Sequence, residues 1–247
     1  MPGAKDLPFG TAEVNRYTGR IVNSPPLFIV LPGGAYESHA DTEAEPVADW
    51  LRSLGLEALV FRYPVRSSAG TARDAVHDLV SRARSGGMDG LVYDATRVGV
   101  IGFSAGGHLA GHAALTGIAG DSRPDLAVLS YPVVSMRRDP HVQSRDHLLG
   151  SPATLVAQHA ASLENLVTVD APPMFLWHTA ADTDVPASHT YGLAGALAAS
   201  GVYHSCHVFP RGAHGLDLAK GAGTTTEAWT PLLEAFLNEL GWLATAT

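Results

Sequence analysis

The chain has 247 residues, 46% hydrophobic and 16% charged, which suits one α/β domain over residues 1–247 and excludes a disordered chain. Its formal net charge of −8 argues against a nucleic-acid or anionic-membrane partner. Cys206 is the single cysteine, which excludes an internal disulfide and zinc sites built on cysteine pairs. Residues 1–6 lack the apolar core of a secretory signal, and no apolar run reaches transmembrane length. A cytoplasmic location is therefore the default expectation.

Short β-like runs alternate with amphipathic segments, which predicts an α/β fold with a mainly parallel central sheet flanked by helices. In chain order, the expected strands are residues 27–31, 58–61, 97–101, 126–130, 174–177 and 203–209. The expected helices are residues 43–54, 71–84, 105–115, 186–199 and 226–240. Thr42 is the expected N-cap of the first helix, with Glu45 completing a capping box. Gly55 and Gly201 are expected just beyond two helix ends.

Residues 135–172 interrupt this alternation between two core strands. The segment begins with charged residues and histidines, and two short helices are expected near 145–149 and 152–160. An insertion of this length within a compact domain is usually functional. We therefore expect a small helical cap or lid. Together with Tyr36 and His39, this segment is a candidate for shaping a substrate cleft.

A candidate nucleophile lies in residues 98–110, which read VGVIGFSAGGHLA. A short apolar run ends in Gly-x-Ser-x-Gly, and a helix-forming run of small residues follows, which is the strand–turn–helix context of a nucleophilic serine. Gly102 and Gly106 lack the Cβ atoms that would clash in so sharp a turn. Ser104 would stand at its tip, where the helix N-terminus favours an oxyanion. The alternative is a glycine-rich turn with an ordinary surface serine.

A serine nucleophile needs a base and an acid to orient that base, and in this fold order both follow the serine in the chain. His214 fits the base, because it lies between glycines just after the strand at 203–209. Two acids follow the strand at 174–177, and of these Asp182 is preferred over Asp184. Asp184 is the better placed to cap the helix expected from residue 186, although exchanged roles remain open.

The run LPGGAY at residues 31–36 follows the first core strand. Small residues there would let backbone N–H groups approach a substrate oxygen. The expected oxyanion-hole donors are the N–H groups of Gly34, Ala35 and Ala105. A tight Gly-Gly turn with no such role is the alternative reading.

These segments resemble α/β-hydrolase esterases, specifically the small prokaryotic acetyl-esterase/lipase group, often described as acting on acetylated sugars and xylan fragments. The resemblance extends over most of the chain and includes EAEPVA at 43–48, FRYPV at 61–65, SRDHLLG at 144–150, PPMFLWHTAAD at 172–182 and GAHGL at 212–216. It implies the α/β-hydrolase fold, with Ser104 as nucleophile, Asp182 as acid and His214 as base. Related lipases often have His-Gly-Gly-Gly where this chain has Pro-Gly-Gly-Ala, which changes the donor loop.

The resulting hypothesis is a serine carboxylesterase that hydrolyses short-chain, acetyl esters through an acyl-enzyme, with acetylated sugars as candidate substrates. Such chemistry needs no metal and no organic cofactor, and the expected partner is a small-molecule ester. An amide hydrolase, such as a formamidase or peptidase, would use the same three residues. A non-catalytic hydrolase-like binding protein is a further alternative, which the intact set of three residues disfavours.

Overall fold

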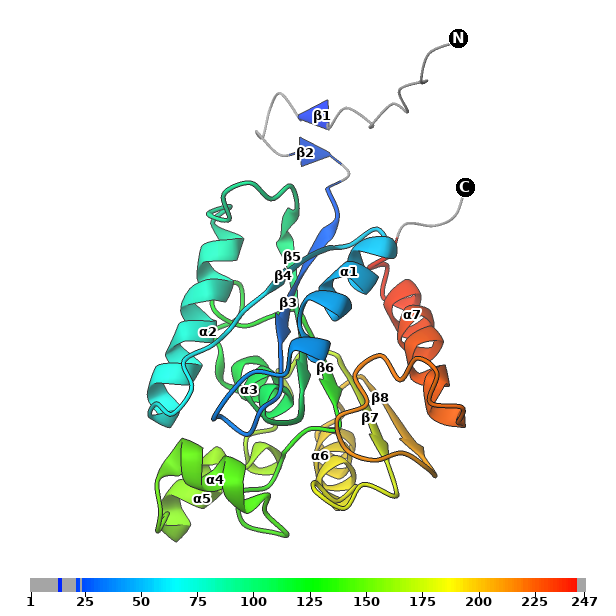
Figure 1. Ribbon diagram of the computed structural model, residues 1–247. Helices are drawn as coiled ribbons and strands as arrows, with labels where there is room; N and C mark the ends of the chain where they lie inside the picture. The colour runs from blue at the N-terminus through cyan, green and yellow to red at the C-terminus, as the bar shows by residue number, and fades with distance from the viewer. Residues whose placement is uncertain (1–12, 15–20, 23, 244–247) are drawn as a thin grey trace.

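A six-stranded sheet forms the centre of the protein (Figure 1). The computed structural model describes residues 13–14, 21–22 and 24–243. All neighbouring strands of the sheet run parallel, in the order β4-β3-β5-β6-β7-β8. These strands are β3 (Pro26–Leu31), β4 (Glu57–Val60), β5 (Asp94–Phe103), β6 (Leu126–Ser130), β7 (Met174–Thr179) and β8 (His204–Phe209). The predicted parallel sheet is confirmed, and a short antiparallel pair, β1 (Glu13–Val14) and β2 (Ile21–Val22), was not predicted.

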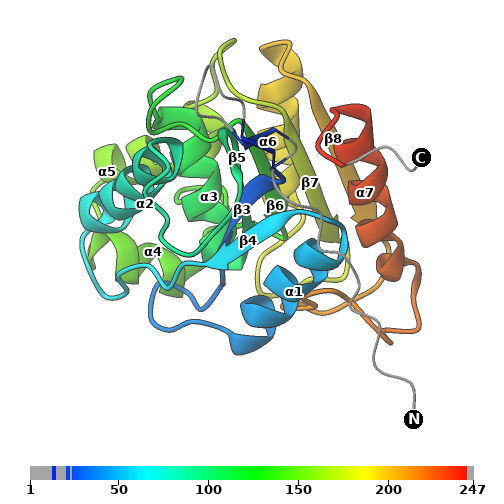
Figure 2. The same cartoon turned by 90° about the horizontal axis from the view of Figure 1, so that it is seen from above.

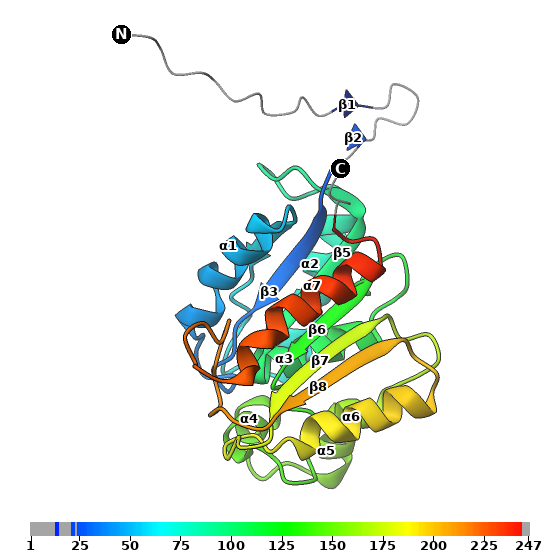
Figure 3. The ribbon, with the colours of Figure 1, turned by 90° about the vertical axis from the view of Figure 1, so that its right-hand side faces the viewer.

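Five longer helices cover the two faces of the sheet, as expected from the alternating pattern. They are α1 (Glu45–Ser53), α2 (Ala69–Arg84), α3 (Ser104–Thr116), α6 (Ser188–Ala199) and α7 (Trp229–Glu239). Helices α2, α3 and α6 pack on one face, whereas α1 and α7 pack on the other (Figures 2 and 3). None of the helices among the described residues combines the length and apolarity needed to cross a bilayer.

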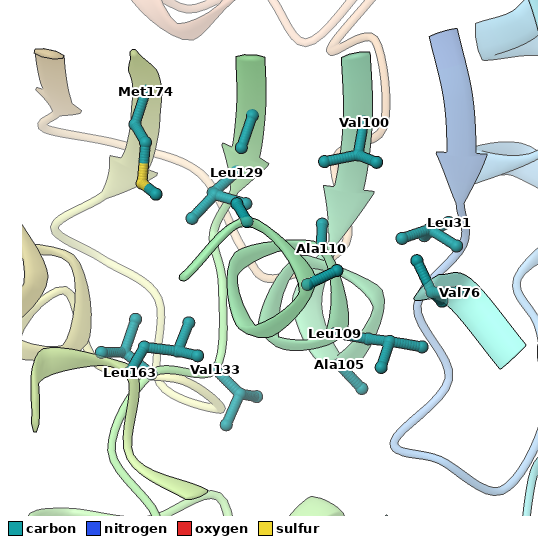
Figure 4. Close-up of a cluster of buried hydrophobic side chains, with 14 of the residues drawn as sticks. Leu31, Val76, Val100, Ala105, Leu109, Ala110, Leu129, Val133, Leu163 and Met174 are labelled. Atoms are coloured by element: carbon teal, nitrogen blue, oxygen red, sulfur yellow. The ribbon is translucent and has the colours of Figure 1, made fainter. Parts of the chain in front are cut away.

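The core lies in two apolar layers, one on each face of the sheet, because strands buried on both sides carry apolar residues at successive positions. In one layer, Val100 and Leu129 of the central strands meet Leu109 and Ala110 of α3 (Figure 4). In the other, Trp177 stacks on Trp229 of α7 with ring centroids 4.9 Å apart. The two layers together bury both faces of the sheet, and the loops that follow each strand extend from its carboxyl edge.

Strand order reverses between β3 and β5, since β4 lies on one side of β3 and β5 on the other. In open α/β sheets, ligands bind at the carboxyl edge beside such a switch point. Two short helices of the segment 135–172, α4 (Val142–Leu149) and α5 (Leu155–Ala161), lie beyond this edge (Figure 1), and a 3-10 turn, η2 (Leu163–Asn165), packs against α3 and α6. The two helices expected in this segment are therefore present, with shifted ends.

Three helices begin later in the chain than predicted. Residues 41–43 form a separate 3-10 turn, η1 (Asp41–Glu43), so α1 begins at Glu45 behind Ala44, and Thr42 does not cap it. Helix α6 begins at Ser188 behind Ala187, without a side-chain cap from Asp184. Residues 225–228 likewise form a 3-10 turn, η3 (Thr225–Ala228), before α7. The two predicted C-terminal glycines are confirmed, with φ 82° at position 55 and 67° at position 201.

Candidate active site

Ser104 stands at the turn from β5 into α3, with φ 52°. This left-handed conformation is unfavourable for a serine and is maintained by the packing around it. A Cβ atom on Gly106 would overlap the carbonyl oxygens of Leu31 and Pro32, so only glycine lets α3 approach the end of β3 this closely. The strand–turn–helix predicted around Ser104 is thus present.

The structure brings Ser104, His214 and Asp182 together from three separate loops. His214 Nε2 lies 2.7 Å from Ser104 Oγ, and His214 Nδ1 lies 2.6 Å from Asp182 Oδ2. Because a carboxylate oxygen only accepts, Nδ1 carries the ring proton and Nε2 accepts the serine hydroxyl. Ser104 and Asp182 are each 6% exposed, so both ends of this chain of hydrogen bonds are buried. A base is therefore within reach of the serine, and an acid is within reach of that base.

Asp182, not Asp184, is the acid beside His214. Its Oδ1 accepts the backbone N–H groups of Asp184 and Val185, each at 3.0 Å, while the side chain of Asp184 is exposed. Burial by itself would raise the pKa of Asp182, but hydrogen bonds from His178 and His214 outweigh burial and hold that pKa well below its usual range. Asp182 therefore stays ionised at neutral pH and can stabilise a protonated His214.

The oxyanion loop, residues 32–36, follows β3 and lies beside Ser104. Gly34 has φ 131° and Ala35 has φ 54°, and a Cβ atom on Gly34 would overlap the carbonyl of Ser38. Within residues 24–243, neither the Gly34 nor the Ala35 N–H has an intramolecular acceptor. Ala105 lies in the first turn of α3, where N–H groups have no helical partner. Gly34 and Ala35 thus line one cavity with Ser104, and Ala105 follows Ser104 directly in α3.

Ser104 and His214 both line an open cavity of about 330 Å³. Its lining residues are Gly34, Ala35, Glu37, Ser38, Ala40, Glu43, Ser104, His141, Gln143, His214 and Gly215. Of the candidates for shaping the cleft, only the segment 135–172 lines it, through His141 and Gln143. Tyr36 is 2% exposed and its hydroxyl donates to His108 Nδ1 at 2.6 Å, away from this wall. His39 instead packs edge-on against Tyr63, with ring centroids 4.7 Å apart.

Helix α4 is attached to the oxyanion loop and the residue after it by two hydrogen bonds. Gln143 Nε2 donates to Glu37 Oε2 at 2.7 Å, and His147 Nδ1 donates to the carbonyl of Ala35 at 3.0 Å. Arg66 forms an ion pair with the other carboxylate oxygen of Glu37. The segment 135–172 thus forms part of one side of the cavity and restrains the loop that carries two of the donors.

Two residues of this region were missed by sequence reasoning. Glu43, which had been placed in a helix, is 3% exposed and accepts hydrogen bonds from the Gly33 N–H and the Tyr131 hydroxyl, both at 2.7 Å. The ring of Tyr131 packs edge-on against His214, with centroids 5.0 Å apart. A glutamate near a helix start is normally solvent-exposed, so no local pattern identified it. Within the described ranges, no group of three potential ligand side chains forms a metal site.

The sequence profile of the prolyl oligopeptidase family matches residues 66–240. An endo-1,4-beta-xylanase B of Butyrivibrio fibrisolvens is 32% identical over 207 residues, which are 77% of this chain and 32% of that protein. An acetylxylan esterase of Xylanibacter ruminicola is 30% identical over 230 residues, which are 86% of this chain and 44% of that protein. The chain therefore spans less than half the length of these two relatives.

Among solved structures, an acetyl ester-xyloside bifunctional hydrolase from Caldicellulosiruptor lactoaceticus superposes with a TM-score of 0.84 at 35% sequence identity. The match covers 90% of this chain and 85% of that one. With the parallel sheet and the family match, this likeness identifies the α/β-hydrolase fold, as the resemblance of the motifs implied.

Proposed function

We propose that this chain, a member of the prolyl oligopeptidase family, is a serine carboxylesterase that cleaves short acyl esters, with acetylated sugars as substrates. The observation that carries the proposal is the hydrogen-bonded chain from Ser104 through His214 to Asp182 at the wall of an open cavity. The similarity to an acetylxylan esterase and to an acetyl ester-xyloside hydrolase supports the acyl group and the sugar.

In the proposed reaction, His214 Nε2 takes the hydroxyl proton of Ser104 while Oγ attacks the ester carbonyl. The N–H groups of Gly34, Ala35 and Ala105 hold the oxyanion, each contributing about 3 kcal/mol to lowering the barrier. Protonated His214 then gives its proton to the leaving alcohol. Water attacks the acyl-enzyme by the same steps in reverse, and Asp182 remains ionised and orients the imidazole throughout.

Several residues lining the cavity can bind a polar leaving group. Glu37, Ser38, His141 and Gln143 bring hydrogen-bonding groups to the wall around the serine, beside a larger apolar share of the exposed lining surface. A sugar alcohol presents several hydroxyl groups that such side chains can bind.

Amide hydrolysis is the second candidate, since the matching family takes its name from a peptidase. The same three residues serve both reactions, because His214 can protonate a leaving amine as well as an alcohol. The similarity to an acetylxylan esterase and to an acetyl ester-xyloside hydrolase favours the ester, and amide cleavage is an outcome of the experiment below.

The test compares hydrolysis of p-nitrophenyl acetate by the wild type, Ser104→Ala and a control, Ser85→Ala. Ser85 is an exposed residue at the end of α2. We expect turnover to fall by about 10⁴-fold or more in Ser104→Ala alone. Acetylated xylose, p-nitrophenyl butyrate and an acetyl anilide then compare sugar ester, longer acyl chain and amide. Anilide cleavage without ester cleavage would replace the esterase with an amidase, and no turnover of any substrate would favour a binding protein.

A further inference from the structure

Glu43 is a buried carboxylate beside the cavity, and it has no role in the reaction proposed for Ser104, His214 and Asp182. We propose that Glu43 is a positioning residue that, through Tyr131, holds the oxyanion loop and the histidine loop (residues 210–219) in a fixed relation. The catalytic part of this inference rests on the proposed esterase function. Its structural part, that one carboxylate restrains two loops, does not.

The first contact of Glu43 is with the oxyanion loop. Its Oε2 accepts the N–H of Gly33 at 2.7 Å. Gly33 immediately precedes the two proposed donors, so fixing its N–H restricts how far the backbone that carries them can shift. The loop has little freedom here, because a Cβ atom on Gly33 would lie 2.6 Å from Glu43 Oε2 and 3.1 Å from the Cβ of Ser104. The carboxylate therefore holds the loop against the nucleophile.

The second contact of Glu43 is with Tyr131, which connects it to the histidine loop. The Tyr131 hydroxyl donates to Glu43 Oε1 at 2.7 Å and accepts the backbone N–H of Asp217 at 2.9 Å. Its ring packs against the imidazole of His214, and its own N–H is bound to the carbonyl of Trp177 on β7 at 2.7 Å. Tyr131 is thus fixed to the sheet and contacts the histidine loop both at its backbone and at the base.

Stability alone does not account for a carboxylate at this position. Burial raises the pKa of Glu43, and the hydrogen bonds from Tyr131 and Gly33 counteract that rise. Replacing a buried charged group by an apolar side chain of similar volume is often neutral or stabilising. A carboxylate differs from such a side chain in having two oxygens that accept from two directions. Here each oxygen binds a different half of the candidate active site.

The kinetic test measures kcat and KM for p-nitrophenyl acetate in Glu43→Gln, Tyr131→Phe and the double variant. We expect kcat to fall about 10- to 100-fold in each single variant, because donors and base are displaced by fractions of an ångström, while KM changes little. In the double variant, kcat should fall no further than in the more impaired single variant, since both residues act through one contact. Ser130→Ala is the matched control. It removes the buried hydrogen bond between Trp177 Nε1 and Ser130 Oγ without touching Glu43.

A second measurement does not depend on activity. Hydrogen exchange followed by mass spectrometry should show faster exchange in both residues 32–40 and residues 210–219 of Glu43→Ala and Tyr131→Phe. Ser130→Ala should show neither change when each variant is measured at the same number of degrees below its own Tm. If Glu43→Ala does not fold, Tyr131→Phe, which keeps the ring, decides the question.

The outcomes separate the two proposals. An inactive wild type would refute the esterase, and the exchange data would still decide whether Glu43 restrains both loops. An active wild type whose Glu43→Gln and Tyr131→Phe variants match Ser130→Ala in kcat would overturn the positioning role. Faster exchange confined to residues 32–40 would also overturn it, because the connection to the histidine loop would then be absent.

Discussion

The imidazole Nε2 of His178 lies 3.2 Å from Asp182 Oδ2, the same oxygen that binds His214. His178 Nε2 also donates to the carbonyl of Val185 at 2.8 Å, and its Nδ1 accepts the hydroxyl of Thr190 at 2.8 Å. The ring is therefore held from three sides within the fold. Asp182 Oδ2 therefore lies close to two imidazoles, that of His178 and that of His214, and only the second reaches the serine.

Asp182→Asn should lower kcat for p-nitrophenyl acetate by about 10³- to 10⁴-fold. An amide in place of the carboxylate loses the charge that stabilises protonated His214 and can impose the wrong ring tautomer. Asp184→Asn is the control for the alternative acid and should retain nearly full activity, because its side chain is exposed. A greater loss in Asp184→Asn than in Asp182→Asn would exchange the two assignments.

Acid should destabilise the protein partly through His108. Burial is the main cause that lowers the pKa of His108 to about 3, and its neighbour His112 adds to the effect. Between pH 6.5 and 3 the unfolded chain therefore binds a proton that the folded chain does not, so stability falls as the pH falls. The slope for one such group is about 1.4 kcal/mol per pH unit.

His108→Gln removes this proton while an amide can still bind the Tyr36 hydroxyl and the carbonyl of Ala161. The free energy of unfolding, measured with urea at pH 7.5 and at pH 5, gives the comparison. The advantage of the wild type over the variant should shrink by about 2 kcal/mol at the lower pH. Equal pH dependence in the two proteins would show that His108 takes up no additional proton on unfolding.

Gly106→Ala should destabilise the protein by about 3 kcal/mol or more and should lower kcat. The added methyl group meets backbone carbonyls of Leu31 and Pro32, which cannot move without shifting the end of β3. Gly195→Ala is the contrasting change, because Gly195 lies on α6 with open space around it. That substitution should raise the free energy of unfolding by about 1 kcal/mol. Equal effects of the two substitutions would contradict the close approach of α3 to β3.

Leu163→Ala should cost about 2 to 5 kcal/mol in the free energy of unfolding. Leu163 is fully buried and packs on α3, where a Cβ atom on Gly111 would lie 2.6 Å from its Cδ1. Leu155→Ala on α5 is the control, since Leu155 is 64% exposed, and should change stability by less than about 0.5 kcal/mol. Both variants should unfold in one transition if the segment 135–172 belongs to the same domain. A separate early transition in Leu163→Ala would make the segment an independent unit.

Local sequence patterns were sufficient to predict the parallel sheet, the flanking helices and the three residues that meet at its edge. Each of those residues carries a local signal: Ser104 has flanking glycines, Asp182 follows a buried, mainly apolar strand, and His214 lies between glycines after a strand of alternating pattern. Carboxyl ends of parallel strands lie on one edge, so placing each residue after its strand was sufficient to bring the three together. Residues 32–36 were located for the same reason, as a glycine-containing turn after a buried strand.

The partners of Glu43 and the start of α1 depend on tertiary packing that no local pattern contains. The hydrogen bond from Tyr131 to Glu43 joins residues 88 positions apart, and neither residue differs locally from an ordinary helix-start glutamate or strand-end tyrosine. The same holds for Thr42, whose capping pattern is displaced by the 3-10 turn that buries Glu43. Local patterns report what a segment favours in isolation. Which distant donor meets a buried carboxylate depends on how the packed sheet brings separate loops into contact.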